Sequence, residues 1–286
     1  MTGSADAPSG GQPKQLSNLQ LRVVSAVVLA IAVLSLTWIG GFPFRLLAAG
    51  IAGAIFYEWT RMARVGTGGS LGFLPEALML VCIGALIVGA PAWILLLLTA
   101  AAALVLLIAG RMQRAGRWEA AGLAYAALSG VSLALLRDGD DAGLVAILFL
   151  FAVVWATDIL AYFVGRAVGG PKLAPSISPG KTWSGAIGGA VGGVAAGIVL
   201  SALAGAGVSL VLVIVALLLS VISQVGDLFE SWVKRRNGVK DSGNLIPGHG
   251  GVMDRVDGLV AAAFALYVIG WVFGRADYPA HALFPV

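Results

Sequence analysis

The sequence predicts an all-α, polytopic integral membrane protein with about nine transmembrane helices. Hydrophobic residues make up 59% of the chain and charged residues only 11%, and the mean hydropathy is +0.95. A soluble domain carries about 25% charged residues, so this chain has too few charges to cover a water-facing surface. Most of its surface is therefore expected to face lipid. The same composition excludes a disordered protein, except at the ends of the chain.

The chain divides into a polar tail and one membrane domain. Residues 1–22 are rich in Gly, Pro, Ser and Gln and predict a flexible cytoplasmic tail, whereas residues 23–286 predict a single membrane domain. Many apolar runs follow the first one, so we interpret that run as a membrane span rather than a cleaved signal. A span needs about 20 apolar residues. Nine such runs occur, at residues 23–40, 43–60, 73–89, 91–109, 119–136, 142–166, 183–203, 207–228 and 256–274.

Two of these regions carry local signals of packing. The third and fourth runs meet at Gly89-Ala90-Pro91, which predicts a tight turn. In the seventh run glycines recur at every fourth residue, and such a stripe lets a neighbouring helix approach closely. Packing of this kind, inside the chain or in a homodimer, is favoured over any glycine-loop chemistry. The stripe consists of Gly185, Gly189, Gly193 and Gly197.

The distribution of Lys and Arg predicts the orientation of the nine spans. Cytoplasmic connections of membrane proteins carry an excess of these residues. If the tail and the even-numbered connections share one side, that side holds 15 of the 18 basic residues. The N-terminus is therefore expected in the cytoplasm and the C-terminus outside. The cytoplasmic set is Lys14, Arg22, Arg61, Arg64, Arg111, Arg114, Arg117, Arg166, Lys172, Lys181, Lys234, Arg235, Arg236, Lys240 and Arg255, and the other side holds Arg45, Arg137 and Arg275.

The connection between the sixth and seventh runs, about residues 167–182, is the first candidate for chemistry. Asp158 lies just before it inside an apolar run, where a carboxylate is costly unless it faces a partner or a polar cavity. Asp158 and Tyr162 share a helix face, and an ion pair with Arg166 is the structural alternative. The triplet Gly180-Lys181-Thr182 resembles the end of a phosphate-binding loop, but Pro175 stands where that motif requires glycine. Lys181, nearby serines and the next helix N-terminus can still bind phosphate.

The connection between the eighth and ninth runs, about residues 229–255, is the second candidate. If the eighth helix continues past Asp227, then Asp227, Ser231 and Lys234 lie on one face, and Asn237-Gly238 ends the helix. The region mixes carboxylates with cations, which suits a Mg²⁺-bound polyphosphate. A solvated anchor for anionic lipid is the alternative. The carboxylates are Asp227, Asp241, Asp254 and Asp257, and the cations are Lys234, Arg235, Arg236, Lys240 and Arg255.

A glycine-rich turn at residues 247–251 fits the anchor interpretation poorly, because its backbone can approach a ligand closely. His249 lies in this turn and is one of two histidines. No HExxH motif or Cys/His set accompanies it, so a zinc site is not expected.

The residues quoted above resemble a known family, the phosphatidate cytidylyltransferases or CDP-diacylglycerol synthases. The resemblance covers about the C-terminal half of the chain. One position departs from the family pattern, because Ser184 stands where a Glu is common. The matching segments are Asp158-x2-Ala161-Tyr162-x2-Gly165-Arg166, Ser178-Pro179-x-Lys181-Thr182-Trp183, Gly226-Asp227-x2-Glu230-Ser231, and Ser231-x-Val233-Lys234-Arg235-x4-Lys240-Asp241-x-Gly243-x2-Ile246-Pro247-x-His249-Gly250-Gly251-Val252-x-Asp254-Arg255-Val256-Asp257.

The resemblance implies transfer of CMP from CTP to phosphatidic acid, giving CDP-diacylglycerol and pyrophosphate, at the cytoplasmic face of the inner (plasma) membrane. It implies Mg²⁺, with a second metal ion left open, and membrane lipids but no nucleic acid as partners. Asp227 and Asp254 are the expected metal ligands. Phosphates are assigned to Lys234, Arg235, Lys240 and Arg255, and substrate binding to Asp158, Tyr162, Ser178, Lys181, Thr182, Ser231, Asp241, His249, Gly250, Gly251 and Asp257.

Two other functions are alternatives to this one. A CTP-dependent lipid-alcohol kinase would release CDP instead of pyrophosphate, and the complete signature argues against it. A membrane transporter could use Asp158 and the glycine-rich segments to line a pathway. That function is disfavoured because the charges concentrate in the cytoplasmic connections rather than inside the spans.

Overall fold

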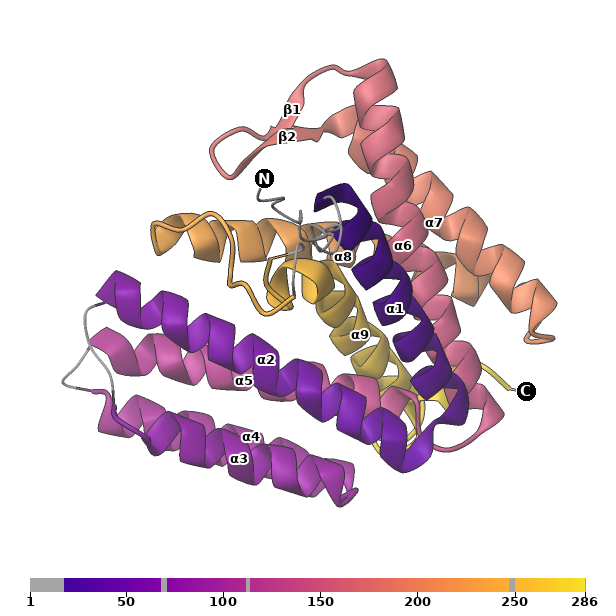
Figure 1. Ribbon diagram of the computed structural model, residues 1–286. Helices are drawn as coiled ribbons and strands as arrows, with labels where there is room; N and C mark the ends of the chain where they lie inside the picture. Colours follow the sequence, from indigo (N-terminus) through magenta and orange to yellow (C-terminus); the bar gives the residue numbers. More distant parts are fainter. Residues whose placement is uncertain (1–17, 68–70, 112–113, 247–249, 286) are drawn as a thin grey trace, which may run out of the picture.

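A computed structural model describes residues 18–67, 71–111, 114–246 and 250–285 of the chain. The predicted tail therefore lies almost entirely outside the described residues. Within them the fold is helical, with one α-helix for each predicted apolar run and a small hairpin (Figure 1). The elements are α1 (Asn18–Ile39), α2 (Gly41–Thr67), α3 (Leu74–Ile87), α4 (Ala92–Ala109), α5 (Arg114–Leu136), α6 (Asp141–Val168), β1 (Lys172–Ala174), β2 (Ser178–Thr182), α7 (Trp183–Leu203), α8 (Leu210–Arg236), α9 (Met253–Phe273) and the 3₁₀ helix η1 (Pro279–Ala282).

Six helices in the described residues are long and apolar enough to cross a membrane: α4 to α9. The apolar parts of α1 and α3 are shorter, and α2 is interrupted by charged residues. Large apolar side chains point outward along these helices, including Leu203 of α7 at 82% and Leu210 of α8 at 75% exposure. An exposed apolar surface of this extent marks contact with a non-aqueous environment. The chain is therefore a multi-pass membrane protein.

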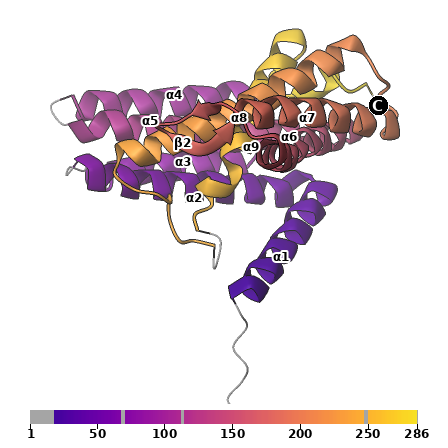
Figure 2. The ribbon, with the colours of Figure 1, turned by 90° about the horizontal axis from the view of Figure 1, so that it is seen from above.

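The helices form two groups that meet along α5 and α9. Helices α2 to α5 pack together in one group, and α6 to α9 form the other (Figure 1). Helix α1 contacts mainly α2 and projects away from both groups (Figure 2). Both segments that carry the predicted chemistry belong to the second group.

The α6–α7 connection contains a hairpin that the sequence analysis did not predict. Strands β1 and β2 are antiparallel, with Lys172 opposite Thr182 and Ala174 opposite Ser178. The Thr182 hydroxyl then accepts a hydrogen bond from the Gly185 N–H at 3.2 Å and caps α7. The hairpin thus holds Lys181 next to the start of a membrane helix.

The eighth helix continues beyond its apolar run, as predicted. Helix α8 passes through Asp227 and ends at Arg236, where Asn237 is the C-cap and Gly238 has a φ of +72°. The expected loop at 229–255 therefore begins with two turns of helix, and Asp227, Ser231 and Lys234 stand on rigid backbone.

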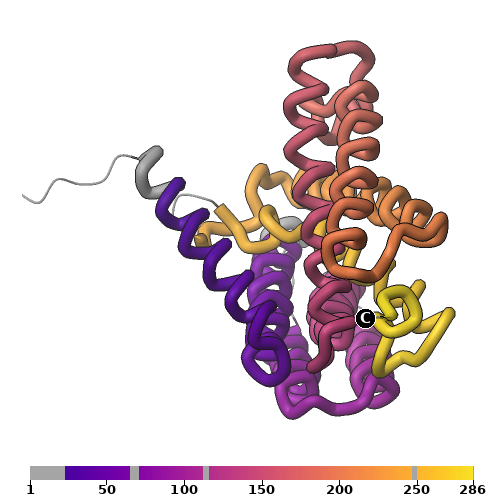
Figure 3. The backbone as a smooth tube through the Cα atoms, turned by 90° about the vertical axis from the view of Figure 1, so that its right-hand side faces the viewer, coloured from indigo at the N-terminus to yellow at the C-terminus, as the bar shows by residue number. Residues whose placement is uncertain are grey.

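The glycine stripe of α7 packs against α6 inside the chain. The two helices run side by side over most of their length (Figure 3). A Cβ atom at Gly189 would lie 2.7 Å from the Thr157 carbonyl oxygen, and one at Gly193 would lie 2.3 Å from the Thr157 hydroxyl. The predicted packing role is therefore confirmed, and it is internal to the chain.

We expect Gly189→Ala to destabilise the protein by about 1–3 kcal/mol, the usual effect of overpacking a tight contact. The new methyl group would meet backbone of α6, so the helices must move apart. Thermal unfolding in detergent would show a lower midpoint. The matched control is Gly84→Ala on α3, where a Cβ atom meets nothing within 4 Å. There the better helix propensity of alanine should leave the midpoint unchanged or raise it. Equal behaviour of the two variants would contradict the packing role.

Candidate active site

A cleft of about 600 Å³ opens between α6, the hairpin, the start of α7 and the middle of α8. It brings together five residues that the sequence analysis assigned to the site from two separate segments: Asp158, Tyr162, Lys181, Thr182 and Asp227. Arg166, Lys172 and Gln224 also line it. The cleft thus combines cations with carboxylates beside apolar helices.

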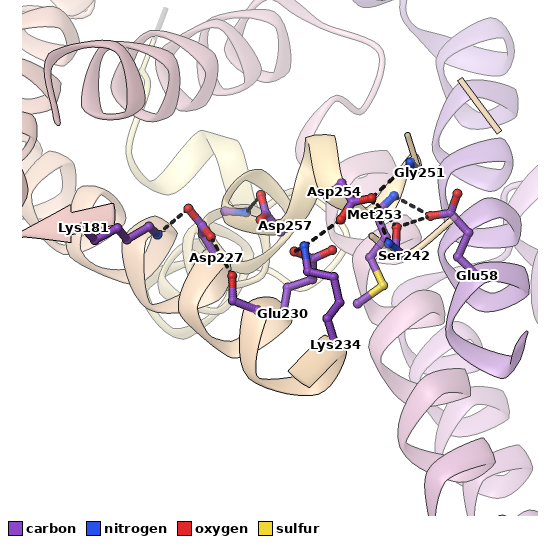
Figure 4. Close-up of polar contacts among 12 residues, drawn as sticks. Glu58, Lys181, Asp227, Glu230, Lys234, Ser242, Gly251, Met253, Asp254 and Asp257 are labelled. Atoms are coloured by element: carbon purple, nitrogen blue, oxygen red, sulfur yellow. Dashed lines mark hydrogen bonds and ion pairs between the residues drawn. The ribbon is translucent and has the colours of Figure 1, made fainter. Parts of the chain in front are cut away.

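Lys181 and Asp227 form an ion pair across this cleft (Figure 4). The Ser231 hydroxyl lies one turn further along α8 and donates to Asp227 Oδ1 at 3.4 Å. Asp158 and Asp257 both interact electrostatically with Asp227. Lys181 acts on both Asp158 and Asp227, and Asp257 of α9 adds a third carboxylate close to Asp227.

The structural alternative for Asp158 is not observed. Arg166 donates to the Tyr162 hydroxyl at 3.0 Å, and the described residues contain no ion pair between Arg166 and Asp158. Asp158 instead lines the cleft. Thr182 is buried and caps α7, so its hydroxyl is engaged by the fold.

Close packing of α8 against α9 places Asp227 beside Asp257. A Cβ atom at Gly226 would lie 2.9 Å from the Asp257 carbonyl oxygen, and one at Gly258 would lie 2.9 Å from the Ser223 carbonyl oxygen. Each glycine immediately adjoins one of the two aspartates in sequence. The two helices can therefore approach at the level of the carboxylates, which explains glycine at both positions.

A second polar cluster surrounds Lys234, one turn below Ser231 on α8. Lys234 Nζ lies 2.8 Å from Glu230 Oε2 and 2.6 Å from Asp254 Oδ1. Asp254 Oδ2 accepts from the Ser242 N–H at 3.0 Å, the Ser242 hydroxyl at 2.8 Å and the Gly251 N–H at 3.1 Å. Both oxygens of Asp254 therefore already have protein donors. The sequence analysis assigned no role to Glu230, although it lies within the matching segment.

Glu58 of α2 completes this cluster from the N-terminal half of the chain (Figure 4). Its carboxylate accepts from the Ser242 hydroxyl at 2.9 Å, the Val252 N–H at 2.9 Å and the Met253 N–H at 2.8 Å. The sequence analysis missed this residue. The signal was a carboxylate inside an apolar run, the same signal that identified Asp158.

Glycines in and near the predicted turn make room for the carboxylate of Glu58. A Cβ atom at Gly251 would lie 2.0 Å from Ser242 Oγ and 2.7 Å from Glu58 Oε2, and one at Gly243 would lie 2.7 Å from Glu58 Oε1. These two glycines thus make room for protein carboxylates. Gly250 has a φ of +85°, which favours glycine at that position.

The remaining predicted residues lie outside the cleft lining. Ser178 is on β2, half-buried and at the far end of the hairpin register from Lys181. His249 lies outside the described residues. The others are exposed residues at the end of α8, in the following connection or at the start of α9: Arg235, Lys240, Asp241 and Arg255.

The carboxylates of the cleft suit a magnesium ion that is bound together with phosphates. Among the described residues, no three His, Cys, Asp or Glu side chains converge closely enough to hold a metal ion alone. Mg²⁺ commonly binds through one or two carboxylates, with waters and substrate phosphates completing its shell. Asp227 and its neighbour Asp257 are hard oxygen ligands of this kind.

The helices and the cleft are those of a multi-pass membrane protein with a site of lysine and carboxylate side chains. The chain belongs to the Cytidylyltransferase family, which matches residues 20–273. It is similar to the phosphatidate cytidylyltransferase of Brucella suis biovar 1, with 49% identity over 94% of this chain and 99% of that protein. The enzyme of the same name from Pseudomonas aeruginosa is 37% identical over 88% of this chain and 98% of its own length. The one from Bacillus subtilis is 31% identical over 88% and 97%. The family resemblance is therefore confirmed over nearly the whole chain.

Proposed function

We propose that this chain transfers CMP from CTP to phosphatidic acid and releases CDP-diacylglycerol and pyrophosphate. The main support is the cleft in which Lys181 and Asp227 meet beside apolar helices. The similarity to phosphatidate cytidylyltransferases is the second support. A lipid-alcohol kinase or a transporter is not favoured, because the relatives described above are all named phosphatidate cytidylyltransferase.

The proposed reaction needs charge neutralisation more than a strong base. A phosphate oxygen of phosphatidic acid attacks the α-phosphorus of CTP and forms a new P–O bond. The P–O bond between the α-phosphorus and the bridging oxygen to the β-phosphate breaks, and pyrophosphate leaves with that electron pair. The nucleophile is already anionic, so the barrier lies in bringing anions together. Fixed cations that face the developing charge lower that barrier.

Magnesium, when bound, would supply positive charge to the phosphates of CTP. Asp227 is the ligand that the cleft favours first, with Asp257 beside it. Asp254 is the second ligand expected from the family resemblance. In the structure Lys234 contacts its Oδ1, so a metal ion bound there would share that carboxylate with Lys234. Lys181, which pairs with Asp227 in the structure, is proposed to hold a phosphate in the complex in which Asp227 would bind a metal ion.

The other predicted residues keep their proposed roles at the mouth of the site. Arg235, Lys240 and Arg255 are exposed cations, as phosphate binding requires. Ser231 and Tyr162 carry hydroxyl groups that face Asp227 and Arg166. The roles of Asp158, Ser178, Thr182, Asp241, His249, Gly250 and Gly251 in substrate binding also remain proposals.

For the topology, we propose that all nine helices enter the membrane, with the N-terminus and the cleft in the cytoplasm and the C-terminus outside. The excess of Lys and Arg on one side supports this orientation. The hairpin and the C-terminal end of α8 lie toward the upper left of Figure 1, and the α5–α6 and α7–α8 turns lie toward the right. The inner membrane is the proposed location, because CTP is cytosolic and the second substrate is a membrane lipid. The α7 glycine stripe is already covered by α6, so a homodimer would have to use another surface.

One assay tests the proposed function. The purified protein is incubated with labelled CTP, Mg²⁺ and phosphatidic acid, and the products are separated. We expect labelled CDP-diacylglycerol and one pyrophosphate for each product molecule. Labelled CDP would indicate a kinase, and the absence of turnover in folded protein would contradict the proposal.

A further inference from the structure

We propose that Glu58 of α2 is a positioning residue for the reaction, which holds the start of α9 and, through Ser242, the carboxylate of Asp254. This inference rests on the proposed cytidylyl transfer. It extends the site to the N-terminal half of the chain, where the sequence resemblance offered no specific motif. Glu58 lies outside the cleft lining, so its action is indirect.

Helix α9 begins without a cap of its own. Val252 occupies the N-cap position and has no oxygen in its side chain, and no side-chain cap bond is formed there. The first N–H groups of a helix need acceptors from elsewhere. The Glu58 carboxylate is that acceptor, although it lies 194 and 195 residues earlier in the sequence. It accepts from the Val252 N–H at 2.9 Å and from the Met253 N–H at 2.8 Å. A carboxylate also interacts favourably with the positive end of the helix dipole.

A single hydroxyl links Glu58 to Asp254. Ser242 Oγ lies 2.9 Å from Glu58 Oε2 and 2.8 Å from Asp254 Oδ2, and its one proton can serve only one of them at a time. Asp254 in turn pairs with Lys234 at 2.6 Å. A displacement of Glu58 is therefore transmitted to the charged groups at the end of α8.

The surroundings of Glu58 are built to keep its carboxylate in place. The residue is only 1% exposed, and a buried carboxylate is costly unless hydrogen bonds satisfy it. The two carboxylate oxygens of Glu58 lie against Gly243 and Gly251, where a Cβ atom on either residue would collide with them. A residue needed only to fill space at this position would be apolar, so the carboxylate itself has a use.

The experiment compares Glu58→Gln with Glu119→Gln in the full-length protein. Glu119 on α5 is also fully buried and also accepts from a backbone N–H, that of Leu71, but it pairs with Arg64 and not with α9. Glutamine keeps the shape of the side chain but places an NH₂ group against donors. We expect kcat to fall about 10- to 100-fold for Glu58→Gln, the effect of a small misplacement of a group in the site. KM for CTP should change little. Glu119→Gln should keep the wild-type kcat.

Coupling to Ser242 separates positioning from a general loss of structure. If Glu58 acts through Ser242, adding Ser242→Ala to Glu58→Gln should lower kcat little further, because directly coupled residues are not additive. Ser242→Ala combined with Glu119→Gln should show independent effects. If Glu58→Gln does not fold, Ser242→Ala alone carries the test and should lower kcat about 10-fold.

A readout without turnover completes the design. Backbone amides of residues 251–256 should exchange with deuterium faster in Glu58→Gln than in wild type, and at the wild-type rate in Glu119→Gln. Wild-type kcat in Glu58→Gln, or unchanged exchange, would overturn the inference. An inactive wild-type protein that shows the expected exchange difference would instead overturn the proposed function and the catalytic part of the inference, leaving the capping contact intact.

Discussion

Asp227→Asn is expected to lower kcat/KM for CDP-diacylglycerol formation by about 10²- to 10³-fold, the range seen when one preorganised charge-stabilising group is removed. Asp227 lines the cleft, pairs with Lys181 and is the first candidate for metal binding. Asparagine keeps the shape of the side chain but loses the negative charge. Lys181 would then lack its partner, and a metal ion would lack a hard anionic ligand.

The loss should appear in turnover and not in stability. The side chains of Lys181 and Asp227 are 28% and 34% exposed, and partly exposed ion pairs contribute about 0–1 kcal/mol. Rates are measured with labelled CTP, and unfolding midpoints in the same detergent. The control is Asp141→Asn, a carboxylate in the first turn of α6, at the opposite end of that helix from the cleft. A folded Asp227→Asn protein with a wild-type rate would remove Asp227 from the site.

Lys234→Met should have the largest effect on stability, about 3–5 kcal/mol, the usual consequence of removing one partner of a buried ion pair. Lys234 is 13% exposed and lies between Glu230, at 1%, and Asp254, at 11%. Methionine fills a similar volume but leaves two buried carboxylates without their cation. The unfolding midpoint in detergent measures the loss.

The adjacent Arg235→Met serves as the control, because Arg235 is exposed and such substitutions usually change stability by less than about 0.5 kcal/mol. The double variant Lys234→Met with Glu230→Gln should regain part of the lost stability, since it removes one uncompensated charge. A Lys234→Met midpoint equal to that of wild type would contradict the role of this ion-pair cluster.

Hydropathy was sufficient to place the helices, because each helix depends on a local run of apolar residues in the sequence. Each span is a run of about 20 apolar residues, readable without knowledge of its neighbours. The seventh run, 183–203, coincides with α7 (Trp183–Leu203). The end of α8 was also readable, because Asn237-Gly238 is a local stop signal. The hairpin was missed because β1 and β2 are short and include Pro179 and Gly180, which weaken any strand pattern.

The site was only partly predictable because its connections are long-range. The sequence motifs identified Lys181 and Asp227, and the fold brought them together across 46 residues. No spacing rule could link Glu58 to Val252, because that contact depends on how α2 packs near the start of α9. For the same reason the sequence could not show that Gly251 lies beside a carboxylate from another helix, that of Glu58.

The contact of Glu58 with α9 has a consequence for biosynthesis. During translation α2 leaves the ribosome long before α9, so its carboxylate is made before the N–H donors of Val252 and Met253 exist. The catalytic half can therefore reach its final geometry only after the last span has been inserted and has docked on the first helical group. Assembly of the enzyme is then a post-insertion event, and nascent chains that stop before α9 remain without the completed polar cluster.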